Sequence, residues 1–166
     1  MFEIKPLPAD AVPAALAKAD HYRLLNEPEE AESICIDVLE VEHENQRALI
    51  LLLLARTDQL DQGSPNTLKR AREVVPRLDG EYERAYYDGL ICERQAKALL
   101  QRRGKRSGFV AYKWFQYALE QYQQAIDSRP EDTADATLRW NTCVRIIERN
   151  PHCVPAPEES AELGLE

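Results

Sequence analysis

The sequence has few of the residues that mark several common protein classes. Only 6 of its 166 residues are glycine, which excludes collagen and glycine-rich low-complexity chains. Its 4 cysteines include no CxxC pair, and with 3 histidines they do not form the spaced pairs of a tetrahedral zinc site. The longest apolar run, 48–55, is far shorter than the roughly 18 residues of a transmembrane helix. We therefore predict a chain without a membrane span, a metal or a cofactor.

Targeting and catalytic motifs are also missing. Residues 1–6 show no basic region followed by an apolar stretch and a small-residue cleavage site, so we expect a cytoplasmic location. The sequence contains neither a glycine-rich phosphate loop nor GxSxG or HExxH, and the one adjacent histidine–cysteine pair, His152-Cys153, lies near the carboxyl end. We therefore predict that the protein is not an enzyme. For Cys35, Cys92 and Cys143, which lie in helical patterns, we expect burial as small apolar residues.

The acidic net charge is unevenly distributed. The formal net charge is −8 overall, but it is −8 over residues 1–62, +4 over 63–150 and −4 over 151–166. An acidic molecule is repelled by nucleic acids and by anionic membranes, so the net charge argues against general binding to either one. The middle of the chain, which also holds ten of the twelve aromatic residues, is the better place to look for a binding site.

Caps, prolines and apolar spacings of three and four predict an all-α fold, because no stretch alternates apolar and polar residues as a strand does. Asn45 is the expected N-cap of the third helix, Pro76 is expected to kink or end the fourth, and Ser107-Gly108 is expected to precede the sixth. The seven expected helices are 10–26, 28–41, 46–60, 65–78, 81–103, 108–128 and 132–149. The remaining 150–166 is expected to be an acidic, proline-containing tail, with one short turn at 158–163.

The even-numbered helices share one spacing of small and apolar residues. A small residue is followed after four positions by a bulky or apolar residue, after three more by another apolar residue, and after five more by a helix-ending position. The three copies are Ala31/Cys35/Val38/His43, Ala71/Val75/Leu78/Glu83 and Ala118/Tyr122/Ala125/Pro130. The preceding helices carry Ala19-x2-Tyr22 and Gly89-x2-Cys92 where a close contact with the partner helix is expected.

This pattern resembles the tetratricopeptide repeat, a unit of two antiparallel helices and 34 residues. The resemblance covers 9–149 and implies an antiparallel helix-pair solenoid over 1–149, with three pairs and the seventh helix as a cap. Copies 40 and 47 residues apart leave insertions, which we place between the paired helices of the second and third units. The long fifth helix is expected to project beyond its neighbours. The constellation by which chaperone-binding members hold a terminal carboxylate is absent.

In the family, the leading helix of each pair lines a concave groove, which here implies a scaffold or adaptor that binds a peptide or partner protein. Arginine and tyrosine commonly anchor interfaces, and the fifth and seventh helices supply Tyr86, Tyr87, Leu90, Arg94, Arg139, Asn141 and Arg145. We predict that these residues contact the partner. The leading helices also offer Asp20, Arg23, Arg56 and Glu93. We expect Trp114, Phe115 and Tyr122 to fill the core.

Two alternatives remain open from the sequence. Four positive charges, Arg102, Arg103, Lys105 and Arg106, lie in five residues beside Gly104 and Gly108, which would make a mobile loop that binds phosphate or RNA with Phe109 and Tyr112 stacking on bases. The same charges also suit a helix carboxyl end, which attracts cations without any ligand. The apolar residues of the seventh helix, which has no partner helix after it, are covered either by the tail or by a second copy of the chain in a homodimer.

Overall fold

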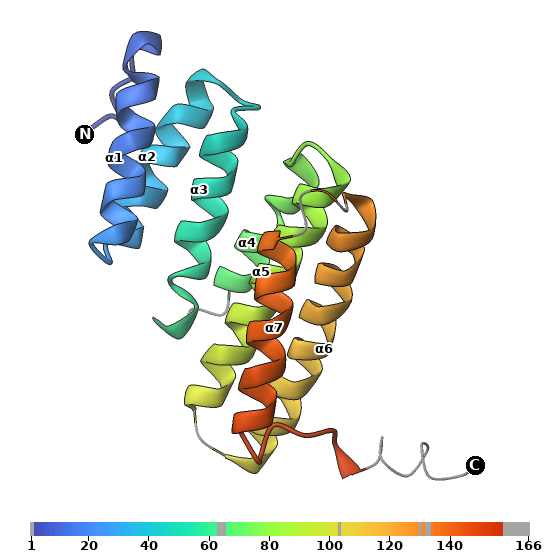
Figure 1. Ribbon diagram of the computed structural model, residues 1–166. Coiled ribbons are helices and arrows are strands. Elements are labelled where there is room, and N and C mark those ends of the chain that lie inside the picture. The colour runs from blue at the N-terminus through green and yellow to red at the C-terminus, as the bar shows by residue number, and fades with distance from the viewer. Residues whose placement is uncertain (1, 63–65, 103, 130, 132–133, 158–166) are drawn as a thin grey trace. The chain divides into compact units, whose positions relative to one another are not determined.

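The computed structural model describes residues 2–62, 66–102, 104–129, 131 and 134–157. Seven α-helices and three short 3-10 helices occur in these ranges, with no strand among them, which confirms the all-α prediction (Figure 1). The chain divides into two compact units, Met1–Asp79 and Gly80–Glu166, which are described separately below. The α-helices are α1 (Val12–Leu24), α2 (Pro28–Val41), α3 (Gln46–Thr57), α4 (Thr67–Arg72), α5 (Glu81–Gln101), α6 (Lys105–Ser128) and α7 (Ala134–Arg149).

The first unit contains α1 to α4. Helix α2 packs against both α1 and α3, and α4 packs on α3 (Figure 1). The turn between α1 and α2 includes Asn26, whose φ of 60° is one that asparagine tolerates better than most residues. Asn45 is the N-cap of α3 as predicted, and its Oδ1 accepts from the backbone N–H of Ala48 at 2.9 Å. The core is made of the fully buried side chains of Ala19, Ala31, Cys35, Val38, Ala48, Leu49, Leu53, Ala55 and Ala71.

The fourth predicted helix is shorter in the structure than 65–78. Helix α4 ends at Arg72, and Pro76 lies in a 3-10 helix, Val75–Arg77, because proline supplies no N–H for the helical ladder. The predicted opening at Ser64-Pro65 lies outside the described residues. The third helix also ends early, at Thr57, and a 3-10 helix at Leu60–Gln62 follows it.

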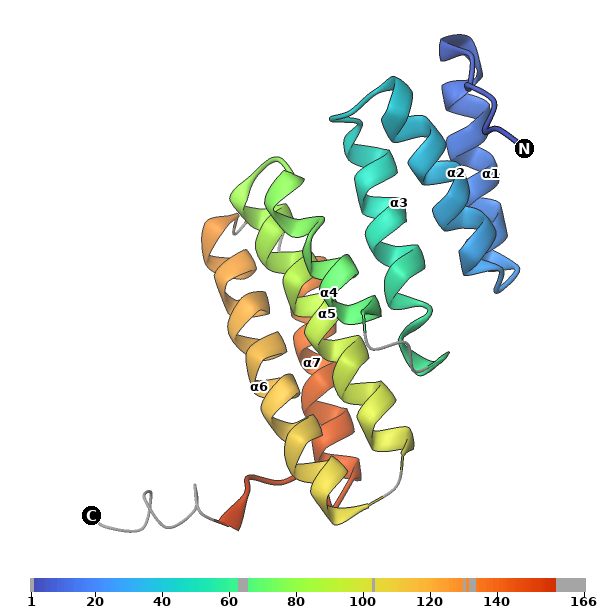
Figure 2. The ribbon, with the colours of Figure 1, turned by 180° about the vertical axis from the view of Figure 1, so that it is seen from behind.

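The second unit is a three-helix arrangement of α5, α6 and α7. Helices α5 and α6 pack along their lengths more extensively than any other pair, and α7 packs mainly on α6 and touches α5 (Figures 1 and 2). A Cβ at Gly89 would lie 2.9 Å from the ring of Tyr122, so a glycine is needed where α5 meets α6. Ala118, Tyr122 and Ala125 of the third repeat copy are all fully buried. Phe115 and Tyr122 belong to the core as expected, and Trp114 packs partly against it.

The length of α6 corrects two sequence predictions. The helix begins at Lys105, three residues before the predicted start, because Gly104 occupies the N-cap position. With 24 residues, α6 is slightly longer than α5, which has 21, so the fifth helix does not project alone. The residues beyond a regular repeat in this pair therefore extend both helices rather than form a long insertion between them.

The segment after α7 is tied to the core of the second unit. Cys153 is 1% exposed and belongs to the same core cluster as Cys92 and Cys143. A Cβ at Gly108 would lie 2.1 Å from the carbonyl oxygen of His152, so the chain crosses α6 where a glycine leaves room. Part of the predicted tail is therefore packed structure. The short turn predicted at 158–163 lies outside the described residues.

Candidate functional site

The second unit has a fully buried carboxylate, Glu93 of α5, at the centre of a polar network. The Tyr122 hydroxyl of α6 donates to Glu93 Oε2 at 2.6 Å, and Arg139 of α7 donates to Oε1 at 3.3 Å. Lys97, one turn further along α5, pairs with the same oxygen. Burial and the nearby charge of Glu93 raise the pKa of the Cys143 thiol. Because a buried charge is costly unless it is paired, this network fixes the positions of α5, α6 and α7 at one point.

The two cations of this network also reach the surface. The side chains of Lys97 and Arg139 are 36% and 37% exposed, whereas Glu93 beneath them is not exposed at all. Burial lowers the pKa of Arg139, but the neighbouring Tyr86 and the charge of Glu93 raise it, and the net direction is upward. Two positive charges therefore share one buried carboxylate.

Tyrosine rings lie beside these cations on α5. The rings of Tyr82 and Tyr86 stack at a centroid distance of 5.8 Å, and Tyr87 meets Tyr86 edge-on at 5.1 Å. At the far end of the row, the Arg129 guanidinium lies 5.0 Å from the centre of the Tyr82 ring. Burial, together with the neighbouring tyrosines and acids, raises the pKa of Tyr87 to about 12, so this phenol is neutral near pH 7.

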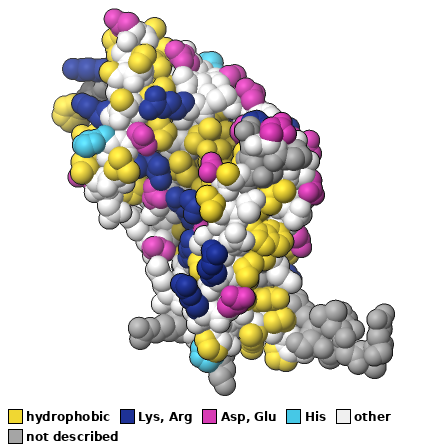
Figure 3. All heavy atoms as spheres, in the orientation of Figure 1, with side chains coloured by type: hydrophobic (Ala, Val, Ile, Leu, Met, Phe, Trp, Pro, Cys, Tyr) yellow, Lys and Arg dark blue, Asp and Glu magenta, His cyan; other side chains and the backbone are white. Residues whose placement is uncertain are grey.

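We name this surface the tyrosine–arginine face and define it by Tyr82, Tyr86, Tyr87, Lys97 and Arg139. In the space-filling view, Lys and Arg side chains gather over α7 and the neighbouring part of α5, with hydrophobic side chains beside them (Figure 3). The rings are held by contacts with one another, and the cations are held by Glu93. A partner that binds here would therefore meet side chains that are already ordered.

The structure brings together three of the residues predicted to contact a partner, namely Tyr86, Tyr87 and Arg139. Arg94 lies seven residues after Tyr87, which places both on one side of α5 because two helical turns span about seven residues. Leu90 is only 2% exposed, so its side chain cannot meet a partner directly.

The other two predicted contacts lie elsewhere on α7. Asn141 and Arg145 are two and six residues after Arg139, which rotates them by roughly 200° and 240° around the helix. They therefore do not share the side of α7 that Arg139 presents to Tyr86 and Glu93. Sequence reasoning placed the seven residues on two helices correctly, but it did not give the rotation of either helix.

Tyr82 and Lys97 belong to the face but were not among the predicted contacts. A signal for both was present in the sequence, since Tyr82-x3-Tyr86 and Glu93-x3-Lys97 have the spacing of side chains that touch along a helix. Glu93, expected in the groove, is instead the buried anchor beneath the face.

The first unit contains a comparable buried carboxylate, Glu32 of α2. Arg56 Nε of α3 donates to its Oε1 at 3.0 Å, Gln59 donates to its Oε2 at 2.9 Å, and Arg70 of α4 pairs with it as well. Arg23 of α1 pairs with Asp58 at 2.8 Å. Two of the cations considered as groove contacts, Arg23 and Arg56, are therefore engaged in holding the helices of this unit together.

At least three of the four cysteines are poor nucleophiles. All four are buried free thiols, as expected for Cys35, Cys92 and Cys143. Burial raises the pKa of Cys35 to about 12 and that of Cys153 to about 11, and it raises the pKa of Cys143 further. A thiol reacts as its thiolate, so none of these three is activated at neutral pH. No group of three or more His, Cys, Asp or Glu side chains suited to a metal occurs in the part of the chain that the structure describes.

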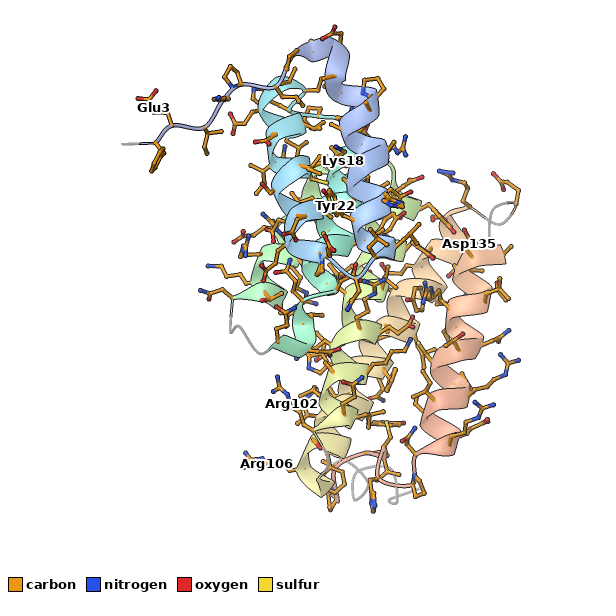
Figure 4. The ribbon with its side chains drawn as sticks, turned by 90° about the vertical axis from the view of Figure 1, so that its left-hand side faces the viewer. Glu3, Lys18, Tyr22, Arg102, Arg106 and Asp135 are labelled. Atoms are coloured by element: carbon orange, nitrogen blue, oxygen red, sulfur yellow. The ribbon has the colours of Figure 1, made fainter. Side chains whose placement is uncertain are left out.

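The basic run 102–106 lies where α5 is joined to α6. Arg102 is the C-cap of α5, Lys105 begins α6, and Arg106 follows in its first turn, while Arg103 lies outside the described residues. The side chains of Arg102 and Arg106 both point outward at this end of the unit (Figure 4). Gly108 is inside α6 rather than in a loop, and Tyr112 packs against the core, which leaves less aromatic surface for stacking on bases than predicted.

Comparison with known proteins gives no relative from which a function can be transferred, since neither the models of protein families nor the curated proteins match this sequence. Among the described residues, no helix is long and apolar enough to cross a membrane.

Proposed function

We propose that this protein is a non-catalytic scaffold or adaptor of the tetratricopeptide type, and that a peptide or partner protein binds its tyrosine–arginine face. The observation that carries this proposal is that Arg139 pairs with the buried Glu93, near Tyr86, while more than a third of its side chain stays exposed. Arginine and tyrosine in an ordered cluster are the residues that most often supply binding energy at protein interfaces.

The chemistry of the face defines the partner. Lys97 and Arg139 favour a carboxylate, because both are cations that stay partly exposed while they pair with the single buried Glu93. Tyr86 and Tyr87 offer ring surface to an apolar or aromatic side chain beside that carboxylate. The proposed ligand is therefore a peptide segment in which an Asp or Glu side chain lies next to an apolar residue.

We also propose that the protein has no catalytic activity. The buried Cys35 and Cys153 and the partly buried Tyr87 support it, because their raised pKa values keep them protonated, and therefore poor nucleophiles, at neutral pH. Among the described residues, every buried side-chain nitrogen and oxygen has a hydrogen-bond partner within the protein, so none of them needs a substrate or cofactor to supply one.

A displayed library of random peptides, selected on the whole chain, tests this proposal. We expect the selected peptides to share an acidic residue beside an apolar one, and their affinity to fall as salt is raised. Arg139→Gln should weaken binding about tenfold or more, which corresponds to about 1.4 kcal/mol.

The matched control is Arg145→Gln, which removes the same charge from another side of α7. We expect binding within about twofold of the unchanged protein for this variant. Circular dichroism verifies that both variants remain helical. If Arg139→Gln is folded and binds the selected peptides as tightly as Arg145→Gln does, the tyrosine–arginine face is not the binding site.

A further inference from the structure

The segment before α1 exposes apolar side chains that the rest of the described chain does not cover. Phe2 is fully exposed and Ile4 is 89% exposed, and they alternate with Glu3 and Lys5. Pro6 and Pro8 fix two φ angles and favour extended backbone in the residue before each, which keeps residues 2–8 from joining the helix. We call residues 2–8 the arm.

A groove on the outer side of α1 and α2 has the properties that such an arm needs. It has a volume of about 290 Å³ and a mainly apolar lining, with one positive and one negative side chain among its residues. It is lined by Leu7, Ala11, Ala14, Ala15 and Lys18 from the first helix and the residues before it, and by Ile34 and Asp37 from α2. Leu7 is thus the one residue of the arm that lines this groove in its own chain, and residues 2–6 lie outside it.

The arm does not fill this groove in its own chain. In the view onto α1 and α2, Lys18 lies on the face that the two helices form, whereas Glu3 lies well to one side, on an arm that runs past α2 (Figure 4). Along the chain, the conformationally restricted Pro6 and the groove residue Leu7 lie between Glu3 and the first helix. The exposed Phe2 and Ile4 and the open groove are therefore available to another molecule at the same time.

We propose that the groove between α1 and α2 binds the arm of a second copy of this chain, so that two copies exchange arms in a two-fold dimer. Charge complementarity supports this occupant. The arm carries Glu3 and Lys5, and the groove carries Lys18 on α1 and Asp37 on α2. Phe2 and Ile4 would rest on the apolar floor, and each charge of the arm would meet an opposite charge at the rim. The exchange is reciprocal, as the interface of a two-fold dimer requires.

This dimer uses a different surface from the one that the sequence suggests. The predicted homodimer forms through the last helix, where Leu138 is 63% exposed. In the structure, Trp140, Ile146 and Ile147 pack against the core of the second unit, which leaves a smaller apolar surface there than the sequence implies. The arm and the groove offer two complementary surfaces, whereas α7 offers one exposed leucine.

Sedimentation equilibrium of the whole chain from about 1 μM to 1 mM tests the proposal. We expect the average mass to rise from one copy to two with concentration. Phe2→Ser with Ile4→Ser should raise the dimer dissociation constant at least tenfold, because the arm then has no apolar side chains to bury. The matched control Leu138→Ser, on α7, should leave it unchanged. A chain that stays monomeric throughout, or a dimer lost only with Leu138→Ser, overturns the proposal.

A second experiment reverses one charge on the arm and one in the groove, and it tests whether these two surfaces contact each other. Glu3→Lys and Lys18→Glu should each weaken the dimer, because each places like charges opposite one another in both contacts. Both side chains are exposed, so neither substitution affects folding. An equal mixture of the two variants should dimerise more tightly than either alone, because each contact in the mixed dimer again pairs opposite charges. If the mixture dimerises no better than the single variants, the arm does not occupy the groove of another copy.

Discussion

Tyr122 is the residue on which the buried network of the second unit most depends. It is fully buried, and its hydroxyl donates to Glu93 at 2.6 Å. Burial and the charge of Glu93 raise the pKa of Tyr122, so its phenol stays neutral in the folded protein well above its ordinary value of about 10. The folded state thus requires a neutral tyrosine at this position.

We predict that Tyr122→Phe destabilises the protein by about 1–3 kcal/mol at pH 7, since Glu93 loses one of its donors. The loss should shrink above about pH 10. There, the unfolded tyrosine ionises while the folded one keeps its proton, so the unchanged protein loses up to about 1.4 kcal/mol per pH unit that phenylalanine does not lose. Urea unfolding between pH 7 and 11 measures both effects.

Tyr117→Phe is the control for this prediction, because Tyr117 lies on the same helix with 42% of its surface exposed. It should change stability little at any of these pH values. The raised pKa values of Tyr87 and the cysteines affect all three proteins equally and cancel in the comparison. A difference between Tyr122→Phe and the unchanged protein that stays constant from pH 7 to 11 would contradict the role given to Tyr122.

At the scale of elements, the segment that follows α7 packs closely against α6 at Gly108, and one added methyl group there would disrupt this contact. A Cβ at Gly108 would overlap the backbone of His152, and backbone atoms cannot move aside as a flexible side chain can. Asn150 helps to hold this segment, since its side chain donates to Ile146 O at 2.7 Å and its carbonyl accepts from Cys153 N at 2.9 Å.

We predict that Gly108→Ala displaces the segment at 150–153 and exposes the Cys153 thiol. Although alanine favours a helix more than glycine by about 1 kcal/mol, the clash with a carbonyl oxygen outweighs that gain. Labelling by a thiol reagent such as an aromatic disulfide, read by mass spectrometry of peptides, should become at least tenfold faster at Cys153 while Cys35 stays protected in the other unit.

Gly104→Ala is the matched control, because a Cβ there would meet only the Ser107 hydroxyl, at 3.7 Å. Its φ of 163° is extended backbone, so alanine fits it without strain. We expect slow labelling of Cys153 in this variant. Equal labelling rates for Gly104→Ala and Gly108→Ala would show that the segment does not depend on close packing at Gly108.

The sequence predicted these elements to different degrees, for physical reasons. Helix 28–41 was predicted residue for residue, because Pro28 can begin a helix and its apolar spacing is regular. The start of α6 was wrong because Gly108 reads as a helix breaker, and only the distant His152 explains why a glycine lies inside the helix. Local signals of this kind cannot report a contact between residues 44 positions apart.

For the candidate site, the sequence likewise does not predict how each helix is rotated about its axis. Tyr86 and Tyr87 are adjacent in sequence, so their contact was predictable from one helix. The place of Arg139 depends on which side of α7 faces α5, and it is the buried Glu93 that decides this. The sequence does not show that Glu93 is buried, so it cannot show which side of α7 faces this carboxylate. For that reason the sequence prediction groups Asn141 and Arg145 with Arg139.

On the scale of the whole molecule, the chain consists of two compact units, Met1–Asp79 and Gly80–Glu166. Each has its own set of buried side chains and its own buried carboxylate, Glu32 in one and Glu93 in the other. The stability of a helical-repeat chain is roughly a sum of local terms, so each part can keep its structure when the chain is divided between two units.

We predict that residues 1–79 and 80–166, produced separately, each fold into a helical unit, because the contacts that satisfy Glu32 and Glu93 lie within one unit each. Units of this size are expected to have a free energy of unfolding of roughly 4–12 kcal/mol. Circular dichroism should give two helical spectra that add up to that of the whole chain, and urea should unfold each fragment cooperatively. If the fragments become helical only when they are mixed, this prediction is wrong, and the chain folds as one cooperative unit.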